Sequence, residues 1–249
     1  MAASPESEPE PLSEFSRVTG VVFEPAKTFA DIAKRPGWIV PLILLILFSL
    51  FYLYGFSVHV GWERAITKAN DASARMSQMP PDQRQRAVEM QLRVAPIMGY
   101  TGIVLFTPLY YLVASGVMLG IVKGLMDAPV TLKQVFAVIS YASAVPRVIF
   151  SMLAGVVMFL QNPDDFDMQN PFASNPGALM SPENSSKFVH SLATSLDVFN
   201  LWVIVLIAIG LKAAGGKSLS FAGALGAVVL PWAVWVLGRA ALASVFSFG

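Results

Sequence analysis

Five long apolar runs dominate the chain, and they constrain its fold more than any other feature. Three of the runs, at 38–58, 94–122 and 218–238, hold no charged residue, and the other two, at 134–160 and 188–211, hold one charge each. About 20 consecutive apolar residues are enough for a helix to cross the hydrocarbon core of a bilayer. Because lipid offers no hydrogen bonds, each such segment has to satisfy its own backbone as a helix. The runs therefore predict an all-α, polytopic membrane protein with a bundle of five transmembrane helices, at about 38–60, 95–122, 134–160, 188–211 and 218–240.

Composition supports this fold class and excludes several chemistries. Only 13% of the residues are charged, against about 25% in soluble domains. The chain has no cysteine, which excludes disulfides, thiolate catalysis and iron–sulfur clusters. Its two histidines, His59 and His190, cannot by themselves form a common zinc site. Phosphate-binding and serine-protease motifs are absent, and a net charge of +1 indicates no nucleic-acid partner. We therefore predict no catalytic residue, no metal and no cofactor.

A short helix is predicted directly before the first span. Pro25 suits a first helical turn, and Pro36 ends the helix about three turns later. One face carries Val22, Ala26, Phe29 and Ala33, and the opposite face carries Lys27, Asp31 and Lys34. The pattern is typical of an amphipathic helix lying at the membrane interface. Its predicted anchors are Phe29, Lys34, Arg35 and Trp38. An ordinary juxtamembrane helix without a partner is the alternative.

The segments outside the spans differ in kind. Residues 1–16 are acidic and proline-rich, which predicts a disordered tail before a membrane domain over 17–249. Residues 63–93 have mixed charge and are predicted to be helical, with prolines opening the second part. The loop at 161–187 is rich in proline, asparagine and serine, and is predicted to be irregular. Its DDFD cluster lacks the glycine and glutamate of an EF-hand loop, so calcium binding is not predicted.

Orientation follows from lysine and arginine near the spans. The short connections at 123–133 and 212–217 hold four cations against one acid, Asp127. On the opposite side, loop 161–187 is acidic, and Arg239 is counted as a cation at the tail. The bias predicts a cytoplasmic N-terminus in a multi-pass protein of the bacterial inner membrane.

Two charges lie inside apolar runs, Arg147 in the third and Asp197 in the fourth. A charge inside the bilayer is costly, so each should face the bundle, face water or reach the interface. They either form a buried pair or polar path, or act independently at different depths. Because antiparallel neighbours would place them at different depths, we expect weak coupling or none.

Glycines at a spacing of four mark the end of the second predicted span: Gly116, Gly120 and Gly124. Such GxxxG steps let helices approach closely. Packing within the bundle is the favoured interpretation, and self-association is the alternative.

Several segments, taken in order, resemble the prokaryotic branch of the Yip domain family of Ypt/Rab-interacting proteins: FEPAKTFADIAKRPGWIVPLIL, SYASAVPRVI, NPFASNPGALM and SLDVFNLWVIVLIAIGLKAAGGKS. The resemblance implies five transmembrane helices, a cytosolic N-terminus and no enzymatic activity. Eukaryotic members bind prenylated Rab GTPases, but the cytosolic N-terminal region is short here. We therefore expect a non-enzymatic protein that organises membrane or partner proteins. The alternative is a small permease or lipid-translocating protein that uses polar residues of the third and fourth helices.

Overall fold

The computed structural model describes residues 10–71, 73–168, 170–180 and 185–245, and these form helices and connections without strands. Five helices are long and apolar enough to cross a membrane, as predicted. Their bounds are Ile39–His59 (α3), Pro81–Gly124 (α6), Leu132–Leu160 (α7), Val198–Gly215 (α9) and Phe221–Val245 (α10). Mean hydropathy over the spanning windows lies between 1.8 and 2.4.

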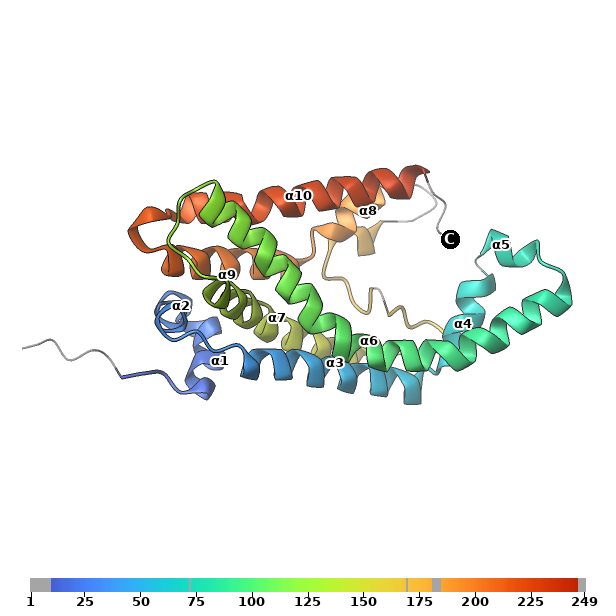
Figure 1. Cartoon of the computed structure of the whole chain (residues 1–249). Coiled ribbons are helices and arrows are strands. Elements are labelled where there is room, and N and C mark those ends of the chain that lie inside the picture. The colour runs from blue at the N-terminus through green and yellow to red at the C-terminus, as the bar shows by residue number, and fades with distance from the viewer. Residues whose placement is uncertain (1–9, 72, 169, 181–184, 246–249) are drawn as a thin grey trace, which may run out of the picture.

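The connections alternate between the two ends of the bundle (Figure 1). One end, here named the α2 end, carries α1 (Glu14–Phe23), α2 (Pro25–Lys34), the connection 125–131 and the short η2 (Gly216–Ser218). The opposite end, the α8 end, carries α4 (Trp62–Asp71), α5 (Ala74–Ser77), η1 (Pro176–Leu179) and α8 (Lys187–Ser195). Each long helix therefore runs antiparallel to the next along the chain.

Helix α7 is the centre of the bundle, because it contacts α1, α2, α3, α6 and α9. Every residue from Val135 to Pro146 is buried. Alanine and serine are frequent in this stretch, so neighbouring helices can approach it closely. Thr131 and Gln134 form a capping box at its start, and Gln134 Nε2 also donates to the carbonyl of Ala33 at 2.9 Å. This bond ties α7 to the end of α2.

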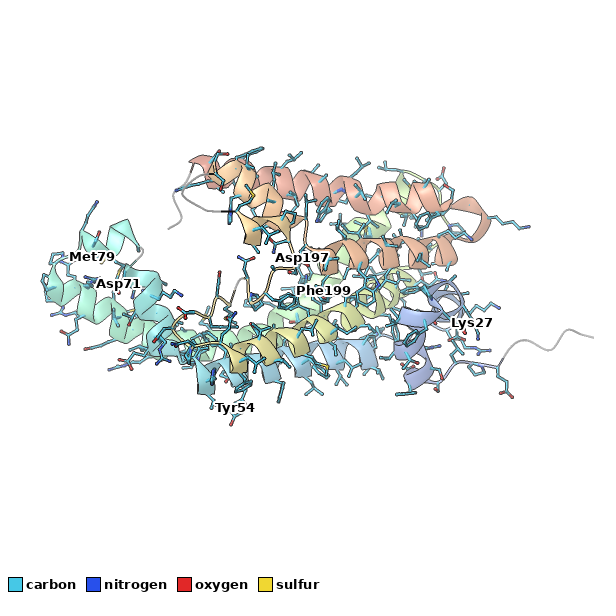
Figure 2. The ribbon with its side chains drawn as sticks, turned by 180° about the vertical axis from the view of Figure 1, so that it is seen from behind. Lys27, Tyr54, Asp71, Met79, Asp197 and Phe199 are labelled. Atoms are coloured by element: carbon cyan, nitrogen blue, oxygen red, sulfur yellow. The ribbon has the colours of Figure 1, made fainter. Side chains whose placement is uncertain are left out.

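Helix α6 is much longer than the predicted span at 95–122. It contains 44 residues, or about 66 Å at 1.5 Å per residue, and so exceeds the hydrocarbon core of about 30 Å. Pro81 opens the helix, while Pro96 and Pro108 lie inside it without ending it. Its first part joins α4 and α5 in an arm that extends beyond the bundle, as the positions of Asp71 and Met79 in Figure 2 show.

The fourth predicted span is not continuous. The structure divides it between α8 and α9, with Leu196 and Asp197 in the break. The cause is local: Asp197 is the N-cap of α9, and its carboxylate accepts from the backbone N–H groups of Phe199 (2.9 Å) and Asn200 (3.2 Å). A side chain that competes for backbone N–H groups favours a new helix start over a continuous helix. The prediction of one helix over 188–211 is therefore corrected to two.

Helix α2 is amphipathic, but its apolar face packs on protein. Thr28, Phe29, Ile32 and Ala33 are buried, and α2 lies against α9 and α7. Phe29 is 0% exposed, so it belongs to the core and is not a lipid-facing anchor as predicted. Gly210 on α9 makes room for it, since a Cβ there would lie 2.9 Å from Phe29 Cδ1. An amphipathic pattern alone does not distinguish a protein surface from a membrane surface.

The other predicted anchors lie where α2 turns into α3. Lys34 and Arg35 are exposed at the end of α2. Trp38 is half-buried before α3, with its ring edge-on to Phe136 at a centroid distance of 5.4 Å. Their role at the membrane surface stays a prediction.

Helix α1 begins at Glu14, within the segment predicted as tail, and residues 1–9 lie outside the described residues. Arg17 on this helix is 5% exposed. Its guanidinium pairs with Asp31 at 2.7 Å and with Glu14 at 3.1 Å, and donates to the carbonyl of Arg35 at 3.1 Å. Glu14 also accepts from the hydroxyl of Tyr141 on α7. Burial lowers the pKa of Arg17, but the hydrogen bonds of Asp31 and Tyr141 more than offset this and raise it.

The three glycines of α6 do not pack helices together within the bundle. Gly116, Gly120 and Gly124 are exposed, and a Cβ at any of them would meet no atom within 4 Å. The favoured interpretation was therefore wrong. These glycines lie on the outward face of α6, and self-association through them stays a prediction.

Candidate functional site

A groove separates α6 from α10 within the membrane-spanning region. Figure 1 shows the two helices close together near the 125–131 connection and diverging toward the α8 end. The cavity between them, here named the α6–α10 groove, has a volume of about 420 Å³. Helices α7, α8 and α9 also contribute to its lining. Its aromatic lining residues are Tyr110, Tyr111, Trp232 and Trp235, and its polar ones are Ser143, Arg147, Thr194, Ser195, Asn200 and Arg239.

Arg147 reaches the groove from near the midpoint of α7. Its Nη2 donates to Oδ1 of Asn200, in the first turn of α9, at 3.1 Å. Neither Nε nor Nη1 has an acceptor among the described residues, and no ion pair joins Arg147 to Asp197. Pro146 frees a backbone carbonyl one turn earlier, but the recorded bond of Arg147 goes to Asn200 instead.

Arg239 reaches the same groove from α10. Its Nη2 donates to the carbonyl of Ser191 (3.3 Å), to Thr194 Oγ1 (3.2 Å) and to Ser195 Oγ (3.1 Å). The cation thus lies at the C-terminal end of α8, where the helix dipole favours positive charge. Arg239 is therefore not, as the sequence predicts, a cation of the tail, because α10 continues beyond it to Val245. The signal in the sequence was that apolar residues continue after Arg239, which indicates that the helix extends beyond it.

Asp197 is not part of the groove lining. Its carboxylate is buried and accepts from Ser174 Oγ in addition to the two N–H groups of α9. Figure 2 shows Asp197 and Phe199 between the α10 layer and α7, whereas Tyr54 points away from the bundle. With these donors the carboxylate acts as a helix cap. The structure therefore brings together Arg147 and Arg239, one on each side of the α8–α9 break, and not Arg147 and Asp197.

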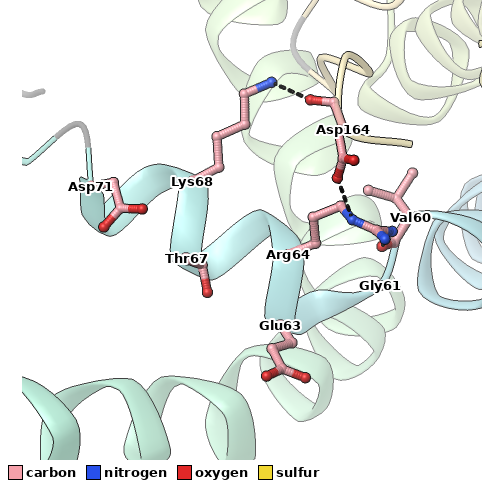
Figure 3. A pocket seen from close by; sticks show the side chains of 8 residues that line it. All are labelled: Val60, Gly61, Glu63, Arg64, Thr67, Lys68, Asp71 and Asp164. Atoms are coloured by element: carbon pink, nitrogen blue, oxygen red, sulfur yellow. Dashed lines mark hydrogen bonds and ion pairs between the residues drawn. The ribbon is translucent and has the colours of Figure 1, made fainter. Parts of the chain in front are cut away.

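A second, wider cavity of about 770 Å³ lies at the α8 end, beside α4 (Figure 3). Arg64 Nε pairs with Asp164 Oδ1 at 2.6 Å, and Lys68 Nζ donates to the carbonyl of Asp164 at 3.0 Å. Asp164 belongs to the DDFD cluster, and here it fastens loop 161–187 to α4. The charges of this cavity are largely directed at one another, so the α6–α10 groove is the stronger candidate site.

The family of the chain follows from a comparison of its sequence with models of known protein families. The family model described as the Yip1 domain matches residues 19–242. The chain belongs to the Yip1 domain family. The match includes four of the long helices in full and α10 as far as residue 242, with all the residues that line the α6–α10 groove, so the groove is part of the Yip1 domain. Together with its five apolar helices, this makes the chain a multi-pass membrane protein. No curated protein and no solved structure matches the chain.

The groove of this Yip1 domain has the chemistry of a binding site. Among the described residues that line it there is no carboxylate and no histidine that could activate its serines or threonine. What it offers is two guanidinium groups, several hydroxyls and a wall of aromatic and aliphatic side chains. Such a surface suits a molecule that has both a polar and an apolar part.

Proposed function

We propose that this Yip1-family protein is a non-enzymatic membrane protein that organises the membrane around it by holding lipid in the α6–α10 groove. The observation that carries the proposal is the pair of arginines, Arg147 and Arg239, in a cavity whose walls are otherwise largely apolar. Holding lipid requires contact with the bilayer. Tyr110 and Trp235, on the two walls, are 66% and 70% exposed on the protein surface, so the groove is open toward lipid.

Energetics support an amphiphilic occupant. An arginine near the bilayer centre costs about 2.5–3.5 kcal/mol on insertion scales. Both guanidiniums retain donors without protein acceptors, as described above, and both residues are exposed on the protein surface. A donor that faces lipid without an acceptor adds to this cost. The described protein offsets these costs only in part, through the bond of Arg147 to Asn200 and the bonds of Arg239 at the end of α8. A lipid whose headgroup lies between α7 and α10 and whose chains cover the aromatic wall would offset both.

The proposal predicts that filling the groove displaces lipid. Ala114 is a half-buried wall residue on α6. Ala114→Phe should weaken the retention of co-purified lipid by about tenfold, or about 1.4 kcal/mol, as measured by native mass spectrometry of the full chain. Val113→Phe is the matched control, because Val113 neighbours it on α6 but is 58% exposed and does not line the groove. Equal lipid retention by the two variants would contradict the proposal.

We further propose that the α2 end faces the cytoplasm, in the bacterial inner membrane, because its short connections carry the excess of lysine and arginine. Reporter fusions after Ala128 and Lys217 should report the cytoplasm, and fusions after Arg75 and Asn175 the opposite compartment. A cytoplasmic signal from Arg75 together with Ala128 would contradict both the orientation and the span count.

Lipid translocation is the second candidate function. It is favoured by one observation: the α8–α9 break lies beside Arg147, near the midpoint of α7. Broken helices at membrane depth commonly mark substrate sites in transporters. In proteoliposomes, a translocator would expose fluorescent lipid of both leaflets to an external quencher. The organising role predicts quenching of the outer leaflet alone.

A further inference from the structure

The two arginines of the groove point to the headgroup chemistry of its occupant. They come from helices that do not follow one another, α7 and α10, and they contact residues on opposite sides of the same break: Asn200 and Ser195. Only five positions separate these two acceptors. The fold therefore places two positive charges on one wall of a cavity inside the membrane-spanning region.

These charges have no counterion in the groove. No acidic residue lines the groove among the described residues. The carboxylate of Asp197, which lies between Ser195 and Asn200 in the sequence, already accepts from Ser174, Phe199 and Asn200, and Asp197 is 9% exposed. In addition, Nε and Nη1 of both arginines have no protein acceptor in the described chain. Both residues are exposed on the protein surface, so inside the membrane-spanning region their free donors require an anion or water from outside the protein.

We propose that the groove binds an anionic phospholipid, with its phosphate between Arg147 and Arg239. This inference rests on the proposed lipid-holding function and names the lipid class. Guanidinium groups form charge-assisted, often bidentate hydrogen bonds with phosphate oxygens. The hydroxyls of Thr194 and Ser195 donate to the carbonyl of Ser191 and accept from Arg239, so they position the guanidinium for the phosphate.

The absence of acidic lining residues in the described chain selects a net-anionic headgroup. A zwitterionic lipid carries an ammonium group that would need a carboxylate or an aromatic cage, and it would add a third cation next to the two arginines. A glycerol headgroup brings only hydroxyls. The chains would lie between Tyr110 on α6 and the two tryptophans of α10, Trp232 and Trp235, which line the groove.

The test is competition between lipids on the full chain, measured by native mass spectrometry. Phosphatidylglycerol and phosphatidylcholine with identical chains are the probes. The wild type should retain phosphatidylglycerol about tenfold more strongly than phosphatidylcholine, the free-energy equivalent of about 1.4 kcal/mol. Arg147→Gln and Arg239→Gln should each remove most of this preference. Arg64→Gln is the matched control, because it removes an arginine that pairs with Asp164 outside the groove.

The same measurement on two lysine variants separates the role of charge from that of fold stability. Because Arg239 also holds the end of α8, Arg147→Lys and Arg239→Lys are included; they keep the charge and should keep the preference for phosphatidylglycerol. Equal retention of the two lipids by the folded wild type, or an unchanged preference in both glutamine variants, would overturn the proposal. So would displacement of phosphatidylglycerol by inorganic phosphate, which would indicate a site for a small free anion. If the wild type shows no preference but Ala114→Phe loses both lipids, the groove holds lipid and only this inference fails. If Ala114→Phe loses neither lipid, the lipid-holding function fails as well.

Discussion

Replacing Arg17 with methionine should lower the free energy of unfolding by about 3–5 kcal/mol, the cost of removing one partner from a buried ion pair. Arg17 is 5% exposed and bonds to Glu14, Asp31 and the carbonyl of Arg35. Methionine keeps most of the buried stem, so the loss reports the missing charge rather than a cavity. In a chain of this length, the melting temperature in detergent should fall by roughly 10 °C.

Lys27→Met is the matched control for this prediction. Lys27 lies on the adjacent helix α2 and pairs with Glu24 at 2.8 Å, but the two side chains are 68% and 58% exposed. An exposed ion pair contributes about 0–1 kcal/mol, so its loss should hardly change the melting temperature. If the two methionine variants had the same melting temperature, the contacts of Arg17 and Glu14 with Asp31 on α2 and Tyr141 on α7 would not stabilise the fold.

The second large effect is expected at Phe29. Phe29→Ala should destabilise the fold by about 3–5 kcal/mol, as is usual for a phenylalanine removed from a packed core, because its ring is 0% exposed between α2, α7 and α9. Trypsin should then cut more rapidly after Lys34, at the end of α2, whereas the bond between Arg35 and Pro36 resists trypsin. Thermal unfolding in detergent, with proteolysis as a second readout, measures both effects.

Phe23→Ala provides the comparison for Phe29. Phe23 ends α1 and is 81% exposed, so its removal should change stability by at most about 0.5 kcal/mol. An interfacial anchor at Phe29 makes the opposite prediction: Phe29→Ala would leave the melting temperature unchanged in detergent and would weaken only membrane attachment. The pair of variants therefore separates a core residue from a lipid-facing one.

The spans were predictable because burial in lipid leaves a direct mark on the sequence. Long uncharged runs have few alternatives to a membrane helix, and the bounds of α3 and α7 lie within two residues of those predicted. Prolines mark helix boundaries at some positions and lie within helices at others. Pro36 precedes α3, but Pro96 and Pro108 lie inside α6, since neighbouring helices and local adjustments can satisfy the backbone groups that proline frees.

The features that the sequence did not predict have a common cause: most of them depend on contacts between segments far apart in the chain. Glu14 and Arg17 look like part of a polar tail until Asp31 and Tyr141 supply partners from α2 and α7. The apolar face of α2 is compatible with lipid or with protein, and only the position of Gly210 on α9 decides it. A hydropathy window also averages over the break at Asp197, although aspartate is a strong N-cap.

In the candidate site, too, one residue could be recognised in the sequence and the other could not. Arg147 was recognisable in the sequence as a charge inside an apolar run, because its cost in lipid is local. Its counterpart was predicted to be Asp197 or nothing. The pairing with Arg239 in one groove depends on α10 lying beside α8 and α9, and no spacing along the chain encodes that arrangement.

The central claim is that the α6–α10 groove of this Yip1-family protein holds a lipid. The most direct test is a crystal structure of the full chain grown from a lipidic mesophase doped with phosphatidylglycerol, at a resolution that shows acyl chains. We predict elongated density along Trp232 and Trp235, ending in a headgroup between Arg147 and Arg239. A groove that holds only ordered water, or that is closed by α10 packing against α6, would contradict the claim.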